Sequence, residues 1–251
     1  MFATSKQLGL LDSIERQHES LNGAWRLRIS ARARTLRIQV HPHGGVEIVA
    51  PSRARPAEIE AFIAEHRDWI ARTQQKFMAG RDAEPLLPTQ IDLTAVAPTS
   101  LQIRYDCAPE SRVSEEGGWL FVTAPVLDAV HCWPLLQSWL KRRARKDILA
   151  TASRVAKDVG IEPRRVHIRL QRSRWGSCSS SGTVSLNAAL LLRSPDELRY
   201  VIVHELCHLQ HMNHSQRYWR LVESFIPDYR LHEKALDTAW QSSPRWLSIL
   251  Y

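Results

Sequence analysis

Apolar side chains recur at helical spacing between Ser194 and Asn213, on one side of the helix that this stretch would form. The apolar positions are Leu198, Ile202, Leu206 and Leu209. Ser194 is a typical N-cap, Pro195 suits the first helical position, and Glu197 completes a capping box. Asn213 is expected to end the helix in a left-handed conformation. The pattern predicts an amphipathic helix with one buried face and one face open to solvent.

Alternating apolar positions predict a sheet near the N-terminus. Residues 25–50 contain two or three such segments, with a turn at residues 41–45. Pro56 then opens a helix whose apolar residues recur as far as Phe77. This part of the chain is therefore expected to be a small sheet with one helix packed on it.

Further strands are expected at residues 91–97, 101–105 and 119–123, with a polar turn at residues 111–118. A long helix follows from Pro134 to Val159, and Gly160 ends it.

Residues 166–170 and 183–192 have the pattern of two more strands. The second lies just before the amphipathic helix, where an exposed sheet edge could pair with an extended peptide. An interior strand fits the same pattern equally well.

These elements fall into two parts. We expect an N-terminal mixed β/α region at residues 1–130 and a second domain at residues 131–251. The second part would contain the amphipathic helix, the long supporting helix and a small antiparallel sheet.

The polar side of the amphipathic helix carries His204, Glu205 and His208 in an H-E-x-x-H sequence. A four-residue step on an α-helix turns about 400° and rises about 6 Å, so both imidazoles can reach one metal ion. Glu205 projects about 100° from His204, where a carboxylate can contact a water without ligating the metal. This spacing is typical of a catalytic zinc site.

A catalytic zinc usually takes three protein ligands, so a third must lie outside the H-E-x-x-H pair. His214 is the nearest candidate, because the chain can turn back after Asn213 before a new helix begins at about Ser215. Glu223, further along, is the carboxylate alternative. His211 shares the ligand side of the first helix but would need distortion of that helix to reach the metal.

Composition is that of a globular protein, with 251 residues and 44% hydrophobic content. The four cysteines form no C-x-x-C pair, which favours a reducing compartment. Cys178 and Cys207 could ligate zinc as thiolates, although a small buried thiol is the more common role. Residues 1–11 do not have a signal-peptide pattern, and no apolar run reaches about 18 residues. We therefore expect a cytoplasmic protein without a membrane segment.

The net charge is +8, and basic residues gather at residues 26–37, 141–146 and 164–174. Such runs are ordinarily solvated faces. The alternative is weak binding to nucleic acid or another polyanion, which a cationic surface attracts.

Four motifs together resemble the YgjP-like zinc metallopeptidases, relatives of the SprT-like and WLM groups. They are RxRWGSC at residues 172–178, SLN at 185–187, YVIVHELCHL at 200–209 and NHSxxYW at 213–219. The resemblance covers residues 135–229, and the N-terminal part is similar to the leader region of that family. It implies a zincin-like α+β fold with His204, His208 and His214 on zinc and Glu205 as the base. Tyr218 departs from the phenylalanine expected there.

The motifs thus predict a zinc-dependent metallopeptidase acting on a protein or peptide. Zinc would acidify a water, and Glu205 would take its proton and later return it to the leaving amine. A further donor should stabilise the oxyanion. The candidates, with the first preferred, are Tyr229, Tyr218, Arg172 and Arg174.

Two other functions use the same residues. The activated water could attack a phosphoanhydride, such as a nucleotide held by basic side chains. Alternatively, the protein could be a non-catalytic polyanion-binding module with a structural zinc. Glu205 argues against the module, because a structural site is normally closed by four ligands and needs no base.

Overall fold

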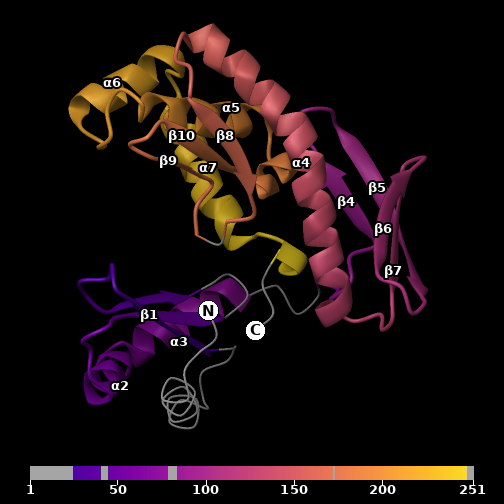
Figure 1. Ribbon diagram of the computed structural model, residues 1–251, viewed down its shortest axis with the longest axis horizontal. Helices are drawn as coiled ribbons and strands as arrows, with labels where there is room; N and C mark the ends of the chain where they lie inside the picture. The colour runs from indigo at the N-terminus through magenta and orange to yellow at the C-terminus, as the bar shows by residue number, and fades with distance from the viewer. Residues whose placement is uncertain (1–24, 41–44, 79–83, 172, 248–251) are drawn as a thin grey trace. The chain divides into compact units, whose positions relative to one another are not determined.

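The computed structural model of the protein describes residues 25–40, 45–78, 84–171 and 173–247 (Figure 1). The chain divides into two compact units, Met1–Glu84 with Gln241–Ile249, and Pro85–Trp240. The division falls at residues 84 and 85 and not at the expected residues 130 and 131. Side chains explain the difference: Trp133 and Trp139 of a long helix donate hydrogen bonds to the Leu86 carbonyl and to Glu115, so residues 85–130 belong with that helix.

The first unit is built on a three-stranded sheet with the order β1-β3-β2. Its strands are β1 (Trp25–Ser30), β2 (Arg37–Val40) and β3 (Val46–Pro51). β3 is central and buried along its whole length, parallel to β1 and antiparallel to β2. The turn expected at residues 41–45 lies, apart from its last residue, outside the described residues.

Two helices, α2 (Pro56–Glu65) and α3 (Arg67–Met78), stand where one was predicted. The break is at His66, which leaves helical geometry and whose Nδ1 lies 2.8 Å from the Phe62 carbonyl oxygen. Apolar spacing continues through the break, since Ile59, Ile63 and Ile70 share one core. The prediction of a single helix was therefore wrong. A short 3-10 helix, η2 (Arg245–Leu247), completes this unit.

In the second unit, a four-stranded sheet has the order β4-β5-β7-β6. Its strands are β4 (Gln90–Leu93), β5 (Thr99–Cys107), β6 (Arg112–Glu116) and β7 (Trp119–Ala124). β6 occupies the stretch predicted to be a turn, and only its pairing with β7 defines it as a strand. It is an edge strand with four exposed positions, so its sequence does not alternate.

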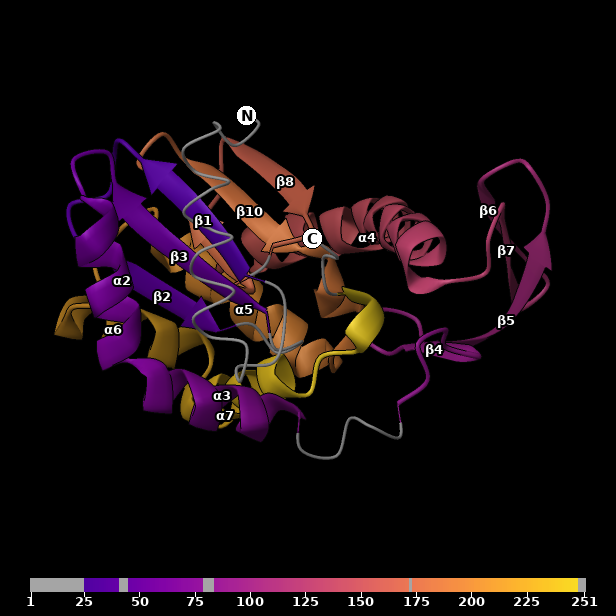
Figure 2. The same ribbon diagram turned by 90° about the horizontal axis from the view of Figure 1, so that it is seen from below.

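Helix α4 (Ala129–Val159) lies between the two sheets of this unit, as both views show (Figure 1 and Figure 2). It starts before the expected Pro134, because the side chain of Asp128 caps it by accepting from the His131 amide. Gly160 ends it as predicted, with the left-handed φ of 69° that favours glycine.

The second sheet has the order β8-β10-β9, from β8 (Arg165–Arg169), β9 (Gly176–Cys178) and β10 (Thr183–Asn187). It is mixed and not antiparallel, because β10 runs parallel to β8 and antiparallel to β9. β10 is the interior strand, so the edge-strand interpretation of residues 183–192 was wrong, and β9 forms an edge. The expected strand also ends early, at the 3-10 helix η1 (Ala188–Leu192), because the Asn187 side chain caps η1.

Three helices complete this unit: α5 (Pro195–Cys207), α6 (Gln216–Phe225) and α7 (Tyr229–Gln241). α5 begins with the predicted Ser194 cap and the reciprocal capping box with Glu197. The α+β fold class is confirmed. No helix among the described residues combines the length and the apolar character needed to cross a membrane.

Candidate metal centre

Three histidines converge at the C-terminal end of α5. The nearest ring nitrogens of His204, His208 and His214 all lie within 4.8 Å of one another. Nε2 of His204 and Nε2 of His214 are 3.3 Å apart. Among the described residues, this group of metal-ligand side chains contains neither Glu223 nor a cysteine. The structure therefore brings His214, and not Glu223, to the H-E-x-x-H pair.

The chain makes room for His214 by leaving the helix early. α5 ends at Cys207, and His208 is its C-cap. Asn213 was expected to end the helix in a left-handed conformation, but no non-glycine residue of the described backbone has a positive φ. That prediction was wrong, since the helix stops at His208. The turn that follows brings His214 back to His204. Ser215 then caps α6, as expected.

Hydrogen bonds orient two of the three imidazoles. Nδ1 of His208 lies 3.0 Å from the carbonyl oxygen of His211. A carbonyl can only accept, so Nδ1 carries the hydrogen. Nε2 then has a free lone pair that can bind a metal. His211 thus contributes its backbone and not its ring.

Nδ1 of His204 lies 3.3 Å from the hydroxyl of Tyr200, one helical turn earlier. Nε2 of His204 faces His214, so Nε2 is the nitrogen that would bind a metal. The ring hydrogen must then be on Nδ1, and the Tyr200 oxygen accepts the hydrogen bond from Nδ1–H. Burial lowers the pKa of His204 to about 3, helped by the neighbouring His208 and His214, so the ring is neutral near pH 7.

Tyr218 packs against the three histidines. Its ring stacks on His208 with centroids 4.5 Å apart, and its hydroxyl donates to the His204 carbonyl oxygen at 3.1 Å. It is fully buried. Its single O–H is therefore used in the fold, which removes Tyr218 from the candidate oxyanion donors.

Tyr229 stands at the start of α7 and stacks on Trp219, with centroids 5.0 Å apart. Trp219 in turn packs against the ring of His214. The Tyr229 oxygen accepts a hydrogen bond from Nε of Arg230. Tyr229 thus lies one aromatic ring away from the histidines. Arg172, another candidate, is outside the described residues.

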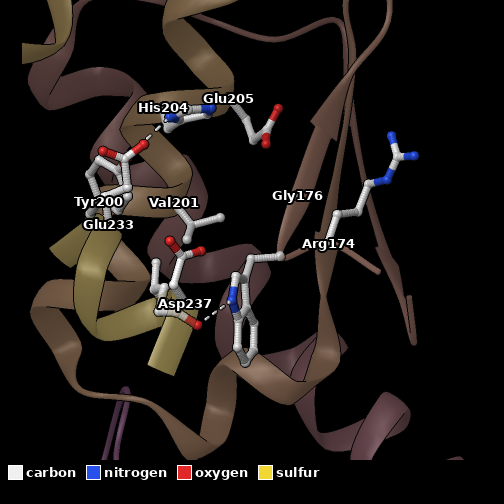
Figure 3. A pocket seen from close by; sticks show the side chains of 10 residues that line it. Arg174, Gly176, Tyr200, Val201, His204, Glu205, Glu233 and Asp237 are labelled. Carbon is white, nitrogen blue, oxygen red and sulfur yellow. Dashed lines mark hydrogen bonds between the residues drawn. The ribbon is translucent and has the colours of Figure 1, made fainter. Parts of the chain in front are cut away.

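Glu205 is nearly enclosed, with 5% of its surface exposed, and its Oε2 has no hydrogen-bond partner among the described residues. Burial raises the pKa of Glu205 to about 8, and Arg174 opposes the shift. A buried polar oxygen without a partner is costly in an ordinary core. Glu205 is one of the residues that line a pocket, shown in Figure 3.

That pocket joins β9, α5 and α7 beside Glu205. Its lining residues are Arg174, Trp175, Gly176, Tyr200, Val201, His204, Glu205, Glu233, Leu236 and Asp237. Of these, the sequence analysis named only Arg174, His204 and Glu205 as site residues. Tyr200 could have been found, since it lies one turn before His204 on the same side of the helix. The others depend on tertiary contacts.

The two cysteines near the site are thiols. Burial raises the pKa of Cys207 to about 12, and it also raises the pKa of Cys178. These residues fit the packing role expected for them.

Three imidazoles whose ring nitrogens come together, beside a carboxyl oxygen with no partner among the described residues, suit a divalent metal and its reacting water. Such a site defines the class of metal-dependent peptidases with an H-E-x-x-H helix. The chain belongs to the YgjP-like family, whose metallopeptidase domain matches residues 34–239. This match confirms the family resemblance.

Two solved structures are similar to part of the chain. One is the metallopeptidase zymogen of Pyrococcus abyssi abylysin, 27% identical, with 38% of this chain and 95% of that chain covered and a TM-score of 0.35. The other is the metallopeptidase zymogen of Methanocaldococcus jannaschii jannalysin, 21% identical, with 38% and 97% covered and a TM-score of 0.33. No curated protein matches the chain.

Proposed function

We propose that this metallopeptidase is zinc-dependent, with His204, His208 and His214 as the ligands and Glu205 as the general base. One observation carries the proposal: three imidazoles converge next to a buried carboxylate whose Oε2 has no partner among the described residues. Three nitrogen ligands leave a fourth position open, as catalytic zinc requires.

When bound, zinc would acidify a water and polarise the carbonyl of the scissile amide. Glu205 accepts a proton from the attacking water at Oε2 and returns it to the leaving amine. Its helix holds it in place, because it lies next to His204 and its carboxylate is confined by Gly176. Tyr200 and the His211 carbonyl act as positioning groups that hold the ligand rings in the required tautomer.

Tyr229 remains the proposed donor to the oxyanion. Its oxygen accepts from Arg230, and its own O–H is given to no acceptor among the described residues. Its stacking on Trp219, which packs on His214, keeps the phenol near the metal ligands. A preorganised O–H of this kind would stabilise charge as it develops.

A peptide fits the pocket better than a phosphoanhydride does. The exposed carboxylates of Glu233 and Asp237 line it, and Arg174 is the cation among the lining residues. This balance of charge repels a polyphosphate.

The test is incubation of the zinc-loaded protein with panels of peptides and nucleotides, beside a Glu205→Gln control. We expect peptide cleavage that is lost on chelation of the metal and in the Glu205→Gln variant. Cleavage of nucleotides without cleavage of any peptide would overturn the proposal.

A further inference from the structure

The pocket beside Glu205 has the size of a site for one side chain. Its volume is about 200 Å³, below the roughly 300–1,000 Å³ of pockets that hold drug-sized ligands. His204 and Glu205 form one wall, so a group bound here lies next to the reacting atoms.

Three of the residues that line the pocket are apolar: Trp175, Val201 and Leu236. The indole N–H of Trp175 donates to the Leu236 carbonyl oxygen at 3.2 Å (Figure 3). This hydrogen bond joins the residue just before β9 to α7. Trp240 packs edge-on against Trp175 with centroids 5.1 Å apart. This wall can cover the methylene stem of a long side chain.

Two carboxylates complete the pocket from α7. Glu233 and Asp237 are four residues apart, hence on one side of the helix, and both are exposed. Neither takes part in an ion pair with another described residue. Like charges at this spacing repel one another, and Arg230, one turn before Glu233, attracts that carboxylate.

A second observation points to the same kind of ligand. Glu205, with 5% of its surface exposed, also lines the pocket (Figure 3), and its Oε2 has no hydrogen-bond partner among the described residues. Three carboxyl groups therefore line a small cavity in which Arg174 is the cation. An apolar stem with a positively charged end complements such a cavity at both ends.

We propose that this pocket is a specificity subsite for the side chain of a lysine or arginine residue that flanks the scissile bond. The stem lies against Trp175, Val201 and Leu236, and the charged end binds Glu233 and Asp237. The inference rests on the proposed peptidase function and adds the substrate class to it.

Peptides that differ at one residue test the subsite. In a series that carries lysine, norleucine or glutamate beside the cleaved bond, the lysine peptide should have a kcat/KM at least about tenfold above that of norleucine, its uncharged analogue. The glutamate peptide should be the poorest substrate. Equal cleavage of the lysine and norleucine peptides would overturn the subsite.

The double variant Glu233→Gln/Asp237→Asn identifies the residues responsible. It should lose most of the preference, measured as the ratio of kcat/KM for the lysine peptide to that for the norleucine peptide. Glu110→Gln/Glu116→Gln is the matched control, because both residues are exposed and outside the pocket, and the net charge changes equally. If both doubles lower the preference alike, long-range charge and not the pocket is responsible.

A binding measurement separates this inference from the peptidase proposal. In the Glu205→Gln background, calorimetry should show tighter binding of the lysine peptide than of the norleucine peptide, and the Glu233→Gln/Asp237→Asn substitutions should remove the difference. If the parent cleaves no peptide but this difference is found, the peptidase proposal fails and the cationic subsite stands. Equal binding of the two peptides overturns the subsite whatever the activity.

Discussion

Gly176 of β9 meets the side chain of Glu205 so closely that a Cβ on Gly176 would lie 2.5 Å from Oε1. Real side chains do not tolerate such a contact, so one of the two groups would have to move. The absence of a side chain at Gly176 therefore lets the edge strand confine the proposed base in one position. This contact links the RWGSC motif, whose last three residues form β9, to the H-E-x-x-H helix.

Gly176→Ala should lower kcat by at least about tenfold while zinc stays bound, since a displaced base is misaligned with the attacking water. Steady-state kinetics and metal analysis of the purified variant check this. The double variant Gly176→Ala/Glu205→Gln supplies the control. If Gly176 acts through the carboxylate, the double variant is no slower than Glu205→Gln alone. Fully additive losses would contradict this relationship.

Glu205→Gln should keep the fold and the zinc but lose peptide hydrolysis by at least about a hundredfold, because the amide cannot accept the proton. Circular dichroism, metal content and peptide kinetics measure the three properties. A variant as active as the parent would exclude Glu205 as the base.

His214→Ala should reduce zinc from about one ion per chain to well below that at micromolar protein, since one of three ligands is lost. Glu223→Ala, on the exposed side of α6, should retain the full complement. Metal analysis after gel filtration distinguishes the two. The opposite pattern would assign the third ligand to Glu223.

Tyr218→Phe should lower the free energy of unfolding by about 1 kcal/mol, through loss of the hydrogen bond to the His204 carbonyl. Peptidase activity should change by no more than a few fold, because the ring still stacks on His208. Urea unfolding of the zinc-loaded protein gives the first quantity. Tyr105→Phe is a comparison, since Tyr105 also donates to a backbone carbonyl, that of Pro88. An activity loss like that of Glu205→Gln would make the Tyr218 hydroxyl catalytic.

The basic run on α4 should bind nucleic acid or another polyanion weakly and without sequence preference. Lys141, Arg142, Arg145 and Lys146 are exposed there, whereas Arg143 is bound to Asp147 and Glu115. Replacing the four exposed residues with glutamine should weaken retention on heparin and flatten the salt dependence, since fewer counterions are released. Cleavage of a short neutral peptide should stay the same.

Zinc-free protein should bind the polyanion equally well. If the parent is not retained on heparin, DNA or RNA at low salt, the run is a solvated face of the helix.

Local sequence signals predicted the site's helices well where short-range geometry decides the structure. The start of α5 follows from Ser194, Pro195 and Glu197, whose mutual hydrogen bonds span a single turn. Asn213 failed as the end of the helix, because the turn after Cys207 is held by backbone bonds and by the His208 ring, which no residue preference encodes.

Contacts between distant segments explain what the sequence did not reveal. β6 is polar and is a strand through its pairing with β7. Gly176 on β9 and Glu233 on α7 show no sign that they line one pocket with Glu205 until the sheet and α7 are folded against α5. Periodicity finds the buried side of an element but not the element that covers it.

The early end of α5 has a consequence for folding. Because the chain turns at His208, His214 returns to His204 across a separation of ten residues, so the proposed ligand set is local in sequence. Closing so short a loop costs little entropy and is fast, on the order of 10–100 ns for ten residues. Zinc could thus be captured by the helix end before the distant β9 and α7 dock. Metal binding and catalytic competence would then arise at different stages of folding. The newly synthesised chain would bind zinc before it could hydrolyse a peptide.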